Sequence, residues 1–183
     1  MIFLTVGASP LPFDRLIRIM DRALGDGRIA EEVVAQIGCS RFLPRTMEYH
    51  RLLDKQAFES VMERSDAVIS HAGMGSISAA LDLGKPILVF PRLARYGEAV
   101  NDHQVCTAQR FAALGHVVAA YADEELVAQI GLLRDFRPSR RMAFPGDVAQ
   151  RVGEFICSLL PPVDVTHYGE SATDAAIEVQ RRR

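Results

Sequence analysis

The sequence has few cysteines, almost no net charge and no long apolar run. Its three cysteines, Cys39, Cys106 and Cys157, are odd in number and far apart, which argues against a disulfide framework or a zinc site. The formal net charge of -2 gives no general attraction to nucleic acid or to anionic lipid. No apolar stretch approaches the roughly 20 residues of a membrane-spanning helix. These absences predict a cytosolic domain with reduced thiols.

The N-terminus also lacks the basic residues that begin a secretory signal, so residues 2–6 are expected to form a buried strand. The chain has 183 residues, 49% of them hydrophobic and 24% charged, which is enough for one domain with a sizeable core. The composition therefore predicts one globular domain.

Residues 66–91 are the most informative stretch, because they predict a strand, a glycine turn, a helix and a second strand. Residues 67–69 and 86–90 are short apolar runs typical of strands that are buried on both faces. Gly73 and Gly75 allow the backbone to turn sharply and to approach a ligand. Ser76 stands where a helix N-cap or first-turn hydroxyl belongs, and Gly84 ends the helix.

This turn has the chemistry of a phosphate site, since a helix N-terminus presents unpaired N–H groups and partial positive charge. It is not the dinucleotide fingerprint, because Ala79 stands where the third glycine belongs, and no Gly-Lys-Ser/Thr follows as in a P-loop. Strand, glycine turn and helix also occur in proteins that bind nothing there. Spacing alone leaves both readings open.

The rest of the chain reads as alternating strands and helices, which predicts an α/β fold with a parallel sheet. Further strands are expected over residues 33–37, 46–49 and 116–120, and helices over 13–24, 54–64, 102–114, 123–133 and 147–160. Asn101 or Asp102 is expected to cap the helix at 102, and Asp123 the helix at 123. The domain boundaries are placed at 1–135, 136–162 (linker and C-terminal helix) and 163–183 (polar tail).

Two further loops follow the carboxyl ends of predicted strands, where ligands collect in open parallel sheets. Gly7 and Ser9 lie in the first loop, which is either a ligand loop or a simple connection. Residues 92–104 form a polar loop with charges of both signs, which is either a binding loop or a solvated surface.

Several ordered motifs over residues 1–135 resemble the donor-binding subunits of two-chain GT-B glycosyltransferases. The resemblance is to subunits of bacterial exopolysaccharide assembly, related to the catalytic subunit of dolichol-linked GlcNAc transferase and to the glycosyltransferase family 28 C-terminal domain. The motifs are Thr5-Val6-Gly7, residues 12–17, residues 70–77, residues 84–87, Pro91-Arg92, Tyr96-Gly97-Glu98 and residues 101–104.

The resemblance implies a Rossmann-like parallel sheet with helices on both faces, equivalent to the C-terminal half of a GT-B enzyme, plus a C-terminal helix. It implies a UDP-sugar donor, an inverting transfer without metal or cofactor, and a polyprenyl-diphosphate-linked acceptor. The sequence starts at the first strand of that half, so the acceptor half is expected from a membrane-anchored partner subunit. The chain is then expected in the cytoplasm, at the inner face of the membrane.

The resemblance also assigns roles by position. Gly7, Ser9, Gly73, Gly75 and Ser76 are expected to line the diphosphate. The candidates for contact with the donor sugar are Asp102, His103 and Gln104, with Glu98 and Arg95 as weaker ones in the same loop.

His71 is expected either to hydrogen-bond the donor or to support the glycine turn. His71 and His103 are also candidates for the catalytic base, although the base of such enzymes can lie in the acceptor half. Relatives often carry a ribose-binding glutamate at the position of Ala79, so this departure puts ribose recognition in doubt and favours a scaffold half-domain without donor chemistry. A different enzyme on the same architecture, such as a sugar-nucleotide epimerase, is the other alternative.

Overall fold

The structure is a computed structural model that describes residues 1–139. The predicted helix over residues 147–160, the tail over 163–183 and Cys157 lie outside the described residues. The predicted domain boundaries stay predictions. No helix within residues 1–139 is long and apolar enough to cross a membrane.

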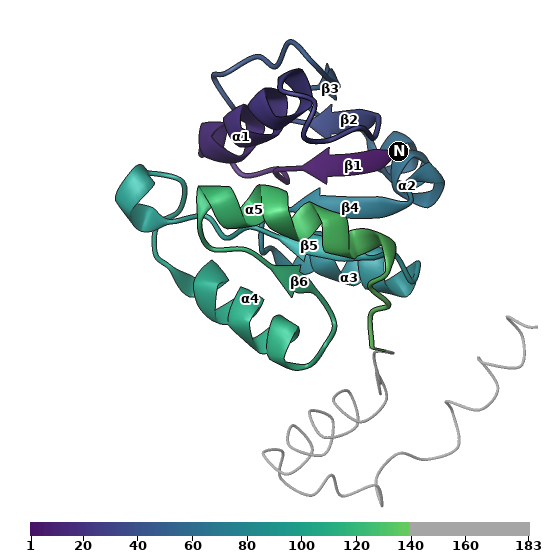
Figure 1. Ribbon diagram of the computed structural model, residues 1–183. Helices are drawn as coiled ribbons and strands as arrows, with labels where there is room; N and C mark the ends of the chain where they lie inside the picture. Colours follow the sequence, from purple (N-terminus) through teal and green to yellow (C-terminus); the bar gives the residue numbers. More distant parts are fainter. Residues whose placement is uncertain (140–183) are drawn as a thin grey trace, which may run out of the picture. The chain divides into compact units, whose positions relative to one another are not determined.

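The described chain forms a six-stranded sheet in the order β3-β2-β1-β4-β5-β6 (Figure 1). All five strand pairs are parallel. The strands are β1 (Ile2–Thr5), β2 (Val33–Gln36), β3 (Glu48–His50), β4 (Ala67–Ser70), β5 (Ile87–Val89) and β6 (Val118–Ala119). Every residue of β1, β2, β4 and β5 is buried, as expected for apolar strands covered on both faces.

Helices cover both faces of this sheet, which confirms the predicted Rossmann-like fold class. Alternate residues of β1 belong to two cores: Leu4 packs with α1 and α5, whereas Phe3 packs with α2, α3 and α4. Figure 1 shows α1 and α5 in front of the sheet. The helices are α1 (Asp14–Gly25), α2 (Lys55–Arg64), α3 (Met74–Asp82), α4 (His103–Ala113) and α5 (Asp123–Ile130), with short 3-10 turns at Ala94–Tyr96 and Gly131–Arg134.

The strand order reverses between β1 and β4, which are neighbours in the sheet. The chain leaves β1 toward β2 on one side, and it leaves β4 toward β5 on the other side. The loops that follow these two strands therefore diverge at the carboxyl edge of the sheet. This reversal is where open α/β sheets bind their ligands.

Helix ends account for most differences from the sequence-based expectations. Asp123 does not cap α5, because the N-cap position belongs to Ala122 and the nearby Tyr121 N–H donates to Glu125 Oε2 at 2.7 Å. The helix expected to run to residue 133 ends at Ile130 and continues as a 3-10 turn. At α4, the Asn101 side chain accepts the His103 N–H at 3.1 Å. Gly84 has a φ of 64° after α3, as expected for a residue that ends a helix.

Candidate functional site

The N-terminus of α3 lies directly after β4, at the reversal of strand order. Gly73 occupies its N-cap position in an extended conformation, and no side chain caps the helix. The first intrahelical bond runs from Ile77 N–H to Gly73 O at 3.1 Å, so the N–H groups of Met74, Gly75 and Ser76 precede it. These groups have no intrahelical acceptor and carry the positive end of the helix dipole.

The His71 imidazole packs between the two glycine loops. An added Cβ at Gly7 would lie 2.5 Å from His71 Cε1, and one at Gly73 would lie 2.1 Å from His71 Nε2. Gly7 also has a φ of 74°, which side chains rarely adopt. His71 Nδ1 lies 3.2 Å from Ser70 Oγ, and the His71 N–H donates to Thr5 O. The position of the His71 ring therefore excludes a side chain at Gly7 and at Gly73, whether or not a ligand binds.

His71 is neutral at physiological pH. Burial, together with the positive charge of Arg92, lowers the His71 pKa from 6.5 to about 4. A group with so low a pKa is a weak base near neutrality. The geometry favours the expectation that His71 supports the turn, and its assignment as the catalytic base stays a prediction.

A cavity of about 690 Å³ opens beside this turn, between α2 and α3. It is lined by Gly7, His71, Gly75 and Ser76 at one end. An added Cβ at Gly75 would meet no atom within 4 Å, in contrast to Gly7 and Gly73. Ser76 is 7% exposed, and none of the hydrogen bonds found within residues 1–139 involves its hydroxyl. The predicted phosphate residues thus border open space.

The other walls of this cavity are apolar and acidic. Leu52, Leu53, Phe58 and Met62 provide an apolar surface from the β3–α2 segment, which could hold a nucleobase. The carboxylates of Glu59, Glu63 and Asp82 line it as well, and so does the Lys55 ammonium group. Ala79 also lines the cavity, so the missing glutamate would have faced this space. The cavity combines backbone N–H donors, an apolar wall and carboxylates that can accept hydrogen bonds from hydroxyl groups.

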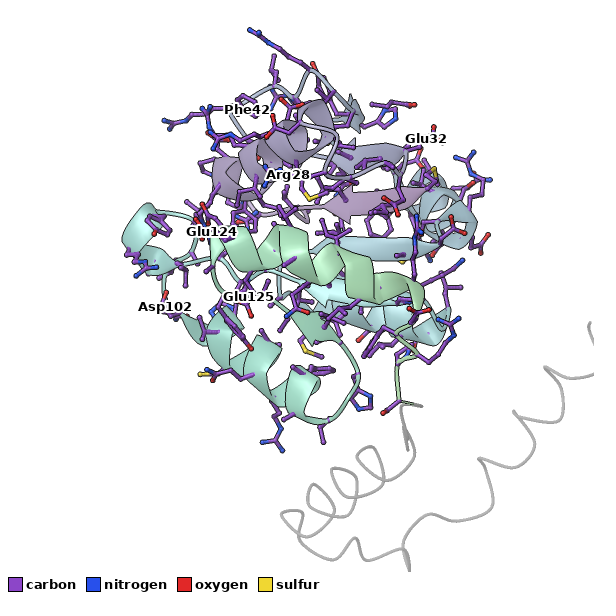
Figure 2. The ribbon with its side chains drawn as sticks, in the orientation of Figure 1. Arg28, Glu32, Phe42, Asp102, Glu124 and Glu125 are labelled. Carbon is purple, nitrogen blue, oxygen red and sulfur yellow. The ribbon has the colours of Figure 1, made fainter. Side chains whose placement is uncertain are left out.

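Ser9 and the candidates of the 92–104 loop do not line this cavity. The Ser9 hydroxyl accepts the Leu11 N–H at 3.2 Å. Asp102 lies on the loop that leads into α4 (Figure 2), and its Oδ1 accepts the Ala94 N–H at 2.7 Å. His103 is exposed and contacts the Asn101 side chain. These three residues lie at the carboxyl edge, and their roles in donor binding stay predictions.

Glu98 and Gln104 are buried and engaged by protein groups. Glu98 is 4% exposed, and its carboxylate accepts hydrogen bonds from Arg15 and from the Leu93 N–H. It lines a separate hollow of about 600 Å³ that is bordered mainly by α1 and α5. Gln104 Oε1 accepts the Arg92 N–H at 3.1 Å. Glu98 thus holds the loop in place, and no hydrogen bond found within residues 1–139 involves the Gln104 amide nitrogen.

Sequence reasoning missed the burial of Arg92. This residue is 2% exposed, although arginine is rarely buried and the 92–104 loop reads as polar. The only sequence signal for this burial was the place of Arg92 in the Pro91-Arg92 motif, directly after the buried β5.

Residues 1–139 contain no cluster of three or more His, Cys, Asp or Glu side chains that could hold a metal ion. The expectation that the reaction needs no metal stays a prediction.

Comparison with known proteins agrees with this architecture. The glycosyltransferase family 28 C-terminal domain matches residues 1–145. UDP-N-acetylglucosamine transferase subunit ALG13 of Homo sapiens is 29% identical in an alignment of 131 residues that covers 63% of this chain and 10% of the human protein. The ALG13 subunit of Eremothecium gossypii is 44% identical over 71 residues, which are 38% of this chain and 33% of that protein.

Solved structures show the same fold at low sequence identity. The NMR structure of ALG13 is 19% identical with a TM-score of 0.52, covering 82% of this chain and 93% of that one. CalG4, the calicheamicin glycosyltransferase, is 18% identical with a TM-score of 0.55, covering 87% of this chain and 44% of CalG4. MurG of Acinetobacter baumannii is 20% identical with a TM-score of 0.53, covering 74% of this chain and 42% of MurG.

The fold is therefore that of GT-B glycosyltransferase C-terminal domains, and the chain belongs to the glycosyltransferase family 28 C-terminal domain family.

Proposed function

We propose that this chain binds a UDP-sugar in the cavity between α2 and α3. The observation that carries the proposal is the uncapped N-terminus of α3 beside open space, at the reversal of strand order. The diphosphate would lie against the N–H groups of Gly75 and Ser76 and against Gly7. The uridine would extend along the apolar wall of the cavity.

The reaction that fits this site is an inverting sugar transfer. Backbone amides and the helix dipole would stabilise the negative charge that develops on the diphosphate as it leaves. The Gln104 amide nitrogen, which takes part in no hydrogen bond found within residues 1–139, would contact the sugar, as its position in the family motif suggests. We propose that the reaction needs no metal ion, because these fixed dipoles supply the stabilisation.

We further propose that a partner subunit completes the enzyme. CalG4 is named a glycosyltransferase, and this chain covers 44% of it, whereas ALG13 is named a subunit. In this proposal the partner is membrane-anchored and binds a polyprenyl-diphosphate-linked acceptor. The chain would then act in the cytoplasm, at the inner face of the membrane, in exopolysaccharide biosynthesis.

A second candidate is a sugar-nucleotide-binding scaffold without transfer activity. Ala79 favours it, because the cavity wall lacks a carboxylate at this position. Both candidates predict nucleotide binding, and only the first predicts transfer.

Calorimetric titration of the purified full chain with UDP, UDP-glucuronate, UDP-glucose, UDP-galactose and UDP-GlcNAc tests the proposal. Saturable binding that is strongest for one nucleotide sugar supports the donor site and names the donor. If none of the five ligands binds, alone or with the partner subunit added, the proposed function is wrong.

A further inference from the structure

Arg92 fastens two loops at the carboxyl edge of the sheet. Its Nη1 donates to Leu11 O at 2.9 Å and to Glu98 O at 2.9 Å, and its Nη2 donates to Val6 O at 2.8 Å. Nη1 also lies 3.3 Å from Pro12 O. The guanidinium carbon lies 4.8 Å from the centre of the Phe13 ring. The side chain thus connects the loop after β1 with the loop after β5.

The positive charge of Arg92 forms no ion pair within residues 1–139, and the nearby Glu98 carboxylate that attracts it is already paired with Arg15. All its hydrogen-bond acceptors are backbone carbonyls, and none of the ion pairs found there includes it. Its Nε is the one buried side-chain nitrogen or oxygen of the described residues without a hydrogen-bond partner. Burying a cation in this way is costly, and holding loops together does not require a charge.

This charge lies close to the glycine turn. Arg92 contacts Val6 O, and the next residue is Gly7, which borders the cavity. The same charge helps to lower the pKa of His71, whose ring touches the positions of both Gly7 and Gly73. The field of Arg92 therefore reaches the residues that surround the proposed diphosphate position. A buried charge is screened by salt much less than a surface charge.

We propose that Arg92 is a positioning residue whose buried charge, which forms no ion pair within residues 1–139, favours binding of the donor's diphosphate without touching it. The inference rests on the proposed function, because it needs a diphosphate ligand in the α2–α3 cavity. It adds a source of positive charge that lies outside the cavity wall. In a protein interior of effective dielectric about 20, such a charge changes affinity for a nearby multiply charged anion by roughly tenfold or more.

Arg92→Met removes the charge and keeps an unbranched side chain. We expect the dissociation constant for UDP to rise about tenfold or more, while affinity for uridine stays within about twofold. Arg92→Lys keeps the charge and loses most of the hydrogen bonds, and it should retain most of the preference for UDP over uridine. Arg92→Gln replaces Arg92→Met if the latter does not fold, as judged by circular dichroism.

Loosening of the loops is controlled by Ser40→Ala. The Ser40 hydroxyl oxygen accepts the Phe13 N–H at 3.3 Å and so holds the end of the loop after β1 that Arg92 contacts. This change removes no charge, so the preference for UDP over uridine should persist. If this control lost the preference as Arg92→Met does, loop order and not charge would explain the effect, and the inference would be overturned.

NMR titration of the His71 imidazole gives a readout that needs no ligand. Removing the Arg92 charge should raise the His71 pKa toward its ordinary value, and Arg92→Lys should leave it low. Equal UDP affinity in wild type and Arg92→Met, or equal losses for UDP and uridine, overturns the inference alone. Absence of UDP binding by the wild type, with or without the partner, overturns the proposed function and this inference with it.

Discussion

Gly73→Ala tests whether the His71 ring fixes the glycine turn. Gly73 has a φ of -92° and a ψ of 135°, which alanine adopts without strain. Any loss of stability must then come from the new Cβ, which would lie 2.1 Å from His71 Nε2 and 2.8 Å from Cδ2. The ring cannot turn away freely, because it also contacts Gly7 and lies 3.2 Å from Ser70 Oγ.

The expected cost follows from overpacking. Forcing one extra carbon into a packed site costs about 1–3 kcal/mol. Alanine gains about 0.4–1 kcal/mol from the lower entropy of the unfolded chain. We therefore expect Gly73→Ala to lower the free energy of unfolding by about 1–2 kcal/mol in urea titrations.

Gly75→Ala is the matched control, two residues along the same helix. Its Cβ would meet no atom within 4 Å, so stability should stay equal or rise by up to about 1 kcal/mol. His71→Ala should relieve the clash, so a double-mutant cycle of His71→Ala with Gly73→Ala should show coupling of about 0.5–3 kcal/mol. Equal stability of Gly73→Ala and Gly75→Ala, or no coupling to His71, would refute the reasoning.

Two further predictions concern His71 and Gln104. The low His71 pKa means that the unfolded chain takes up the proton first as the pH falls from 6.5 toward 4. Stability should therefore fall in this range by at most about 3 kcal/mol, and His71→Asn should flatten this part of the pH profile of unfolding; an unchanged profile would contradict the assignment. Gln104→Ala should lower sugar transfer by the reconstituted enzyme more than UDP affinity in calorimetry, because the proposed contact of its amide nitrogen is with the sugar. An equal loss of both would contradict this role.

The sheet and the glycine turn were predictable because their signals are local. Apolar runs such as residues 67–69 are buried wherever they lie in a parallel sheet, and Gly73 with Gly75 marks a turn by backbone freedom alone. The reversal of strand order then places Gly7 beside this turn. Local patterns therefore predicted most of the residues at the end of the cavity where the diphosphate is proposed to lie.

The 92–104 loop was less predictable because its charges interact over long sequence separations. Glu98 is paired with Arg15, which lies 83 residues earlier, and Arg92 donates to Val6, which lies 86 residues earlier. A sequence pattern treats such residues as exposed, since lone charges favour water. Their burial depends on tertiary acceptors that no local motif encodes.

The ends of α5 show the same limit on a smaller scale. Asp123 has the residue type of an N-cap, but Glu125 Oε2 satisfies the Tyr121 N–H instead, and Asp123 becomes the first residue of the helix. Residues 123–125 are all acidic, and residue type alone could not decide which of their carboxylates accepts the backbone N–H.

The measurement that tests the central claim most directly is a UDP titration of wild type and Gly75→Val side by side. Position 75 faces open space in the cavity, so a valine there should fill the phosphate position without disturbing the packed core. The account predicts saturable UDP binding by the wild type and its loss in Gly75→Val, with nearly unchanged unfolding. Equal UDP affinity in the two proteins would contradict the placement of the diphosphate at this turn.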